Sequence, residues 1–132
     1  MAGRELIIAD TSAWIEFIRD PNSPTGQLMV SLIAGGEVAM IGPVLAELLQ
    51  GSRNEGDLEF LSSNLAGLEF LETDQQVWNL AGRINFNLRR QGYQMAFADL
   101  IIAATSIRHD IPLFTNDSGF SRIPKLRLHE PQ

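Results

Sequence analysis

The chain has 132 residues, no cysteine and a formal net charge of -6, and 45% of its residues are hydrophobic. This length fits one domain with a single core, and the lack of cysteine excludes a disulfide framework, thiolate zinc sites and a cysteine nucleophile. The negative charge argues against broad, nonspecific nucleic-acid binding, but it leaves open an enzyme that holds phosphates through metal ions. No stretch reaches the roughly 20 apolar residues of a membrane span, and no secretory signal is evident, so we expect a cytosolic protein.

The first apolar run, residues 6–9, ends in Asp10, Thr11 and Ser12. This pattern predicts a strand that is buried on both faces and ends in a polar turn, where open α/β sheets place their ligand sites. Asp10 is therefore a candidate site residue. The alternative is that one of these three side chains caps the next helix, whose apolar positions have helical spacing as far as Ile18.

The middle of the chain alternates between predicted helices and strands. In order, it predicts a helix over 25–34, a strand over 38–41 and a helix from 42–43. A polar break over 51–56 follows, and then a helix with apolar positions at Leu58, Leu61 and Leu65 that ends near Gly67. The next elements are a strand over 68–71 and a helix capped by Asp74 and closed by Gly92. Glu47 lies in the first turns of the helix that begins at 42–43. It therefore comes just after a strand end, as Asp10 does.

The most apolar segment, residues 96–104, contains a single carboxylate, Asp99. Its alanine content and its continuation through Arg108 favour a buried helix over a strand. Burying an unpaired carboxylate is costly, and it normally raises the pKa of the carboxyl group or requires a cation. The alternative is that Asp99 is an acid of the first helical turn, stabilised by the helix dipole.

The last part of the chain predicts a short edge strand over 111–114, followed by Thr115, Asn116 and Asp117. Asparagine and aspartate are also ordinary turn residues, so Asp117 alone is weak evidence for a site. Residues 126–128 are candidates for a final strand. Because strands and helices alternate without a repeat or a linker, the sequence predicts a single α/β domain over residues 1–132 with a mainly parallel sheet.

Four carboxylates share one kind of position in this scheme. Each falls at a strand end or in the first turns of an apolar helix, and a parallel sheet brings such ends to one edge: Asp10, Glu47, Asp99 and Asp117. Carboxylates on one edge repel one another unless divalent cations lie between them, and Mg²⁺ or Mn²⁺ suits such oxygen ligands. One or two such ions activate water and stabilise the charge on a phosphodiester. The pattern therefore indicates metal-dependent phosphodiester hydrolysis.

Four short motifs follow one another in a fixed order and are spread over nearly the whole chain. They are Asp10-Thr11-Ser12-Ala13-Trp14-Ile15-Glu16, Glu47 after Gly42-Pro43, Ala98-Asp99-Leu100-Ile101-Ile102-Ala103-Ala104, and Thr115-Asn116-Asp117 before Phe120. With these motifs the chain resembles the PIN-domain ribonucleases, and among them the VapC-type toxins of toxin–antitoxin pairs. The resemblance implies a three-layer α/β/α, Rossmann-like fold. It also implies a Mg²⁺- or Mn²⁺-dependent endoribonuclease that acts on structured cellular RNA, is inhibited by a cognate VapB-type antitoxin and commonly forms a homodimer.

The resemblance also implies roles for individual residues. It places the principal metal ligands at Asp10 and Asp99, the other catalytic acids at Glu47 and Asp117, and side chains that orient ligands or waters at Ser12, Thr115 and Asn116. Gly119 stands where many relatives carry a further acid. The resemblance therefore supports the Asp117 side of the site, and a second metal ion, less strongly than the Asp10 side.

Three other mechanisms fit the sequence less well. A haloacid-dehalogenase-like phosphatase needs a second aspartate where this chain has Ser12. A receiver domain needs an acidic pair before its phosphoacceptor strand, which is absent here, and a lysine on a later strand, whereas the only lysine is Lys125. Catalysis by histidine needs two positioned imidazoles, but His109 lies at a predicted helix end and His129 near the chain end.

A rival of another class is a catalytically inactive PIN-like domain that serves as a binding or assembly module. A binding surface alone has no need for clustered carboxylates, so the four acids argue against it. Metal-dependent cleavage distinguishes the two hypotheses. Four arginines are either phosphate contacts or ordinary surface residues: Arg53, Arg89, Arg90 and Arg108.

Overall fold

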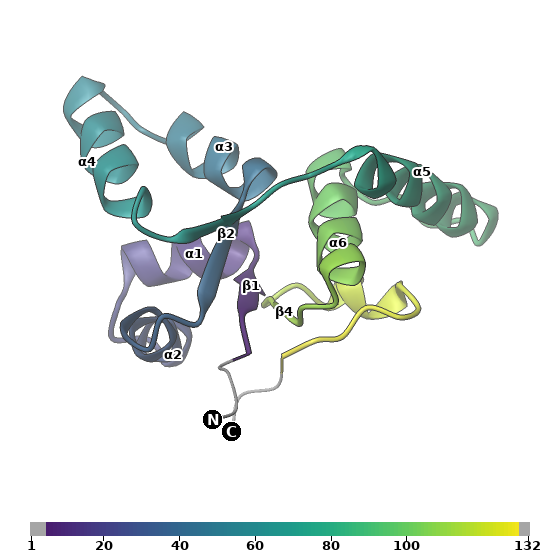
Figure 1. The fold of residues 1–132 in the computed structure, drawn as a ribbon, viewed down its shortest axis with the longest axis horizontal. Coiled ribbons are helices and arrows are strands. Elements are labelled where there is room, and N and C mark those ends of the chain that lie inside the picture. The colour runs from purple at the N-terminus through teal and green to yellow at the C-terminus, as the bar shows by residue number, and fades with distance from the viewer. Residues whose placement is uncertain (1–4, 130–132) are drawn as a thin grey trace.

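The computed structural model describes residues 5–129 as a four-stranded parallel sheet with helices on both faces. The elements are β1 (Ile7–Ala9), α1 (Thr11–Arg19), α2 (Pro24–Ala34), β2 (Val38–Ile41), α3 (Gly42–Gln50), α4 (Glu55–Leu65), β3 (Glu69–Leu71), α5 (Gln75–Arg90), α6 (Phe97–His109), β4 (Leu113–Phe114) and a 3₁₀ helix, η1 (Ser118–Arg122). In Figure 1, α1 and α2 pack together on the left of the sheet, and α5 and α6 pack together on its right. The predicted α/β class with a mainly parallel sheet is confirmed.

The strand order, β3-β2-β1-β4, places β1 and β2 in the centre of the sheet. Every residue of these two strands is buried, which accounts for their unbroken apolar sequences. Ala9 pairs with Phe114, and Ile41 pairs with Leu71, so the strands end at the same edge. The residues that directly follow the strands therefore meet at this edge, which we call the carboxyl edge of the sheet.

Three predicted boundaries are corrected. The edge strand expected over 111–114 comprises only Leu113–Phe114. The helix expected after the polar break over 51–56 begins inside that break, at Glu55, because the side chain of Asn54 accepts a hydrogen bond from the Asp57 amide at 2.9 Å and caps the helix there. The candidate strand over 126–128 reduces to one parallel bridge between Leu113 and Leu128, on the outer side of β4. Within residues 5–129, no helix combines the length and apolarity needed to cross a bilayer.

The C-terminal end of α5 turns the chain back toward the core. Gly92 has φ of +79°, and its amide donates to the Arg89 carbonyl at 2.9 Å while the Tyr93 amide donates to the Leu88 carbonyl at 3.0 Å. A residue in the left-handed region just after a helix, with these backbone bonds, is a common helix-ending motif. The turn brings the Tyr93 ring, which is partly buried, against the core.

Two glycine substitutions in this region should have opposite effects. Gly92→Ala should lower the free energy of unfolding by about 1 kcal/mol, because alanine is strained at a positive φ. Gly82→Ala, in the exposed middle of α5 where an added Cβ meets no atom within 4 Å, should raise it by up to about 1 kcal/mol. Urea unfolding of both variants measures the difference. Equal destabilisation by the two would contradict the conformation of Gly92.

Candidate active site: four carboxylates at the carboxyl edge

Asp10 is the most enclosed acid of the site, with only 3% of its surface exposed. Its Oδ1 accepts hydrogen bonds from the Ala13 amide at 3.0 Å and from the Ser12 hydroxyl at 2.7 Å, and its Oδ2 accepts one from the Thr115 hydroxyl. Asp10 is therefore the N-cap of α1, as the alternative interpretation expected. The same carboxylate also lies at the carboxyl edge, so the two interpretations do not exclude each other.

Glu47 lies in the second turn of α3, which follows β2 directly. Its Oε1 accepts a hydrogen bond from the Thr11 hydroxyl at 2.6 Å. The sequence indicates Thr11 only as a possible helix cap. Its contact with Glu47, which lies 36 positions away, does not follow from the apolar pattern. The bond fixes the Glu47 carboxylate next to the beginning of α1.

Asp99 is the third residue of α6 and is partly exposed. Burial first, and then the negative charges of Asp117, Asp10 and Glu47, raise the pKa of the Asp99 carboxyl from its ordinary value of 3.8 to about 6. A helix N-terminus on its own favours the charged form and lowers the pKa of an acid. Burial and repulsion therefore outweigh the helix dipole at Asp99, and the other three acids are close enough to act on this carboxyl group.

Asp117 is exposed and caps η1, because its Oδ1 accepts a hydrogen bond from the Gly119 amide at 2.8 Å. Its own amide donates to the Thr115 hydroxyl at 2.9 Å, and that hydroxyl donates to Asp10. Thr115 thus connects two of the four acids. The backbone amide of Asn116 donates to the Ser12 hydroxyl at 3.4 Å. Through this bond Asn116 contacts Ser12 and none of the four acids.

The four carboxylates form an oxygen-rich group without closing into a ready-made cage. Within residues 5–129, no three histidine, cysteine, aspartate or glutamate side chains converge as a metal site. Both oxygens of Asp10 already accept hydrogen bonds from side chains of this edge. The donor set still fits a hard cation, because it contains only oxygen and because a cation would stabilise the charged form of Asp99.

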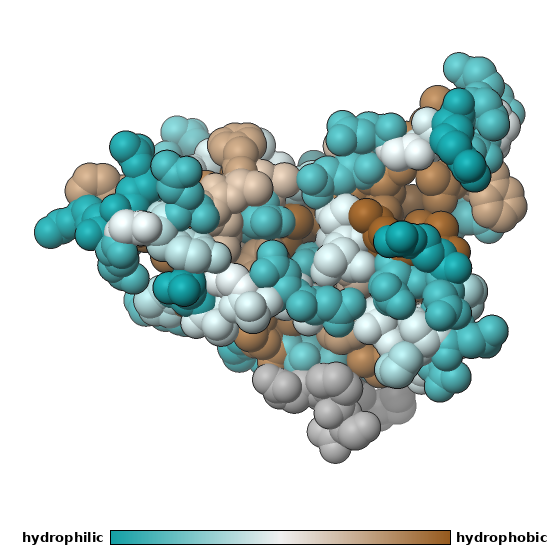
Figure 2. All heavy atoms as spheres, turned by 180° about the vertical axis from the view of Figure 1, so that it is seen from behind, coloured by the Kyte–Doolittle hydropathy of each residue, from teal (hydrophilic) through white to brown (hydrophobic). Residues whose placement is uncertain are grey.

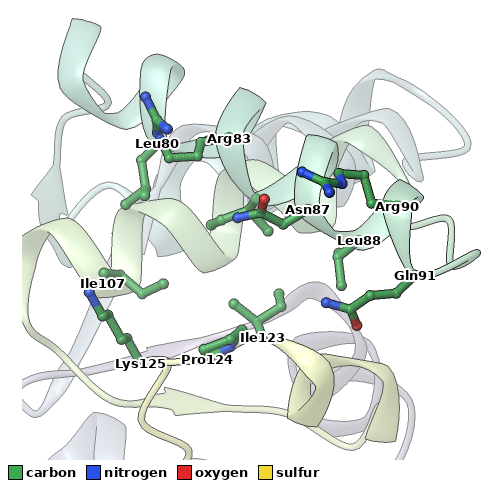
Figure 3. A pocket seen from close by; sticks show the side chains of 11 residues that line it. Leu80, Arg83, Asn87, Leu88, Arg90, Gln91, Ile107, Ile123, Pro124 and Lys125 are labelled. Carbon is green, nitrogen blue, oxygen red and sulfur yellow. The ribbon is translucent and has the colours of Figure 1, made fainter.

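Three of the candidate phosphate-binding arginines have other partners. Arg53 pairs with Asp57 at 3.8 Å, Arg108 pairs with Asp74 at 3.9 Å, and the Arg90 guanidinium lies 5.6 Å from the centre of the Phe86 ring. Arg90 also lines a cavity of about 540 Å³ below α5, which Figure 3 shows from close by. None of the four acids lines this cavity, so it is not part of the candidate site.

Sequence reasoning missed Tyr93. A Cβ added to Gly119 would lie 2.7 Å from the Tyr93 hydroxyl and 3.2 Å from Asp117 Oδ1. The phenol therefore occupies the space beside Asp117 where a side chain at position 119 would begin. The departure at Gly119 was visible in the sequence, but nothing in the sequence indicated which residue fills the space.

The fold and the site together define an α/β protein with clustered carboxylates at the carboxyl edge of a parallel sheet, an arrangement typical of metal-dependent phosphodiesterases. Residues 7–126 match the family described as PIN domain. The chain therefore belongs to the PIN domain family.

Individual relatives agree with this assignment. Ribonuclease VapC11 of Mycobacterium tuberculosis is 29% identical over 125 residues, which span 92% of this chain and 93% of the relative. The VapBC2 structure of Rickettsia felis, bound to a promoter DNA fragment, has 26% identity and a TM-score of 0.80, and covers 94% of this chain and 97% of its own. The DNA-bound VapBC structure of Salmonella typhimurium has 23% identity and a TM-score of 0.82 over 95% of this chain and 97% of its own, which supports the fold alone.

Neutralising Asp99 and neutralising Asp10 should change stability in opposite directions when metal is chelated. The folded state binds the Asp99 proton more tightly than the unfolded chain does, so its contribution to stability is greatest below pH 4 and is lost as the pH rises through 6. At pH 7, Asp99→Asn should therefore raise the free energy of unfolding, by about 1 kcal/mol after allowance for solvent screening. Asp10→Asn should lower it by about 1–2 kcal/mol, because an amide offers one acceptor oxygen to three donors.

Thermal and urea unfolding in EDTA from pH 4 to pH 8 measure both effects. Glu59→Gln removes one charge from the exposed face of α4 and serves as the control. If the stability of the wild type relative to Asp99→Asn did not fall between pH 4 and pH 7, the proposed electrostatic repulsion at Asp99 would be contradicted.

Proposed function

We propose that this chain is a metal-dependent endoribonuclease and the toxic component of a type II toxin–antitoxin pair. The observation that carries the proposal is the electrostatic contact among the four acids on a PIN fold, expressed in the raised pKa of Asp99. A protein that binds only other macromolecules gains nothing from this repulsion, whereas a nuclease uses the same carboxylates to hold a cation. The ribonuclease names of the curated relatives support the choice of RNA as the substrate.

We assign the metal to Asp10 and Asp99, with Mg²⁺ or Mn²⁺ as the ion. Such an ion supplies activation of a water molecule and neutralisation of the phosphate charge. Ser12 and Thr115 hold both oxygens of Asp10 in place, so this carboxylate keeps one orientation.

Glu47 and Asp117 add negative charge near the assigned metal ligands, because both act on the Asp99 carboxyl. Thr11 fixes the Glu47 carboxylate, whereas Asp117 stays exposed just after β4, where it can accept a hydrogen bond from solvent or substrate. We therefore assign both of these acids to catalysis, with Asn116 in a supporting role beside Ser12.

The first test is cleavage of total cellular RNA by the chain free of any antitoxin, with Mg²⁺, with Mn²⁺ and with EDTA. Asp10→Asn and Asp99→Asn should abolish the discrete fragments that the wild type produces, and Glu59→Gln should leave them unchanged. Mn²⁺ should raise the Tm of the wild type but not that of Asp99→Asn. Cleavage that survives EDTA or both substitutions would refute the mechanism. A folded protein that binds Mn²⁺ but cuts no RNA would favour the inactive binding module.

We also propose two protein partners, a VapB-type antitoxin and a second copy of the chain. The Rickettsia felis neighbour is itself a complex named VapBC2, which supports the first. A groove of about 450 Å³ between α1 and α4 offers an apolar surface for it, lined among others by Phe17, Ile18, Phe60 and Leu61. Figure 2 shows hydrophobic side chains gathered in a hollow on this side of the molecule, at the right of the view.

For the second copy we assign the exposed pair of Trp78 and Phe97. Their rings are stacked with centroids 6.4 Å apart, and 47% and 71% of the two residues are exposed. Large aromatic side chains that are this exposed commonly contribute to interfaces. The pair belongs to α5 and α6, on the opposite side of the sheet from α1, so both partners can bind at once.

Substitutions in the two surfaces should separate the two partners. Trp78→Ser should shift the chain from dimer to monomer in light-scattering measurements over a range of concentrations, with little effect on antitoxin binding. Phe60→Ser should weaken the complex with the antitoxin encoded beside the chain by about tenfold or more and leave the dimer intact. A monomeric wild type at all concentrations would refute the homodimer.

A further inference from the structure

Tyr93, the only tyrosine of the chain, lies at the Asp117 side of the acidic pocket. The point where a Gly119 Cβ would lie is 2.7 Å from the Tyr93 hydroxyl and 3.2 Å from Asp117 Oδ1. Two polar oxygens from distant parts of the chain therefore flank one small space. The backbone turn at Gly92 places the ring there, so the position of the hydroxyl is built into the fold.

The Tyr93 hydroxyl is available as a hydrogen-bond donor. The hydroxyls of Thr11, Ser12 and Thr115 each donate to one of the acids. By contrast, no hydrogen bond of the Tyr93 hydroxyl is found within residues 5–129. A half-buried phenol beside a carboxylate, without a partner in the described part of the chain, is free to donate to a ligand.

Arg122 adds a positive charge at the same place. Its guanidinium lies 4.2 Å from the centre of the Tyr93 ring, and the residue is exposed at the end of η1. None of the ion pairs found in residues 5–129 involves Arg122. The contact between cation and ring holds the ring in place and leaves the N–H groups of the guanidinium open to solvent.

We propose that the Tyr93 hydroxyl and the Arg122 guanidinium together bind a phosphate group of the RNA strand, beside Asp117. This inference rests on the proposed ribonuclease function. A phosphodiester has only acceptor oxygens and carries a negative charge, as the four carboxylates do, so the chain must supply donors next to the pocket. A neutral phenol and a guanidinium supply them. Gly119 is then explained as well, because an acid at that position would displace the hydroxyl and add to the repulsion.

The proposal predicts a change in substrate binding rather than in the chemical step. Tyr93→Phe keeps the ring and removes only the hydroxyl, so KM for total RNA should rise about tenfold or more with kcat nearly unchanged. Arg122→Gln should raise KM in the same way. Arg19→Gln removes an equal charge from the exposed C-terminal end of α1 and should leave KM unchanged.

A spectroscopic measurement reports on the site without catalysis. Because the chain has one tyrosine, 3-fluorotyrosine gives a single ¹⁹F resonance at position 93. A 2′-O-methyl hexauridylate, which resists cleavage, should shift this resonance in the presence of Mg²⁺, whereas uridine without phosphate should not. The shift should be lost in Arg122→Gln and kept in Arg19→Gln. An equal shift with uridine would indicate base stacking on the ring and would overturn the phosphate assignment.

Gly119→Ala provides an independent test of the geometry, because it displaces the hydroxyl without removing it. It should raise KM as Tyr93→Phe does, and the double variant should be no worse than either single variant. Additive losses would overturn the proposal. Thermal unfolding excludes global destabilisation as the cause.

The outcomes also separate this inference from the proposed function. Cleavage by the wild type, with normal KM in Tyr93→Phe and no ¹⁹F shift, would reject the phosphate site alone. A ¹⁹F shift without any cleavage would reject the ribonuclease and keep the site. Neither cleavage nor a shift would reject both.

Discussion

The structure depends most on how one buried carboxylate is supplied with hydrogen bonds. Asp10 lies almost entirely out of solvent, at the point where β1 ends and α1 begins. An unpartnered carboxylate there would be strongly unfavourable, and three donors from α1 and from the end of β4 offset the cost. The same bonds join the central strand, the first helix and the last strand. The carboxylate is therefore fixed by the requirements of folding before any ligand binds.

The other three acids accept fewer hydrogen bonds in the described structure than Asp10 does. Glu47 accepts a hydroxyl bond and Asp117 accepts an amide bond, whereas Asp99 is partly buried and faces three like charges. The N-terminus of α6 has no side-chain cap and does not outweigh this repulsion. Asp99 is thus the acid whose charge a divalent cation would stabilise most. This repulsion, which destabilises the chain when no cation is bound, is consistent with the proposed metal site.

The arrangement of the acids could be predicted because it follows from topology. Apolar runs separated by helices indicate parallel strands, and parallel strands end at one edge, so Asp10 and Asp117 were expected at the same edge of the sheet. The hydrogen bonds among these residues could not be predicted in the same way. Thr115 and Asp10 are 105 positions apart, and their contact depends on the register of β1 with β4. Sequence patterns specify which edge a residue occupies but not which oxygen its neighbour reaches.

Tyr93 shows the same limit from the other direction. Its place in the pocket depends on a left-handed glycine and on the absence of a side chain at position 119, two features that lie 27 residues apart in the sequence and show no pattern together. The missing acid at Gly119, taken alone, suggests a weakened site. In the structure the space is filled by a neutral donor next to a cation, and a chain with a net charge of -6 needs such groups to approach a polyanion. If the proposed phosphate site is correct, the glycine at position 119 removes a charge that would repel RNA and leaves room for a donor that binds it, so the departure from the family pattern does not indicate a loss of function.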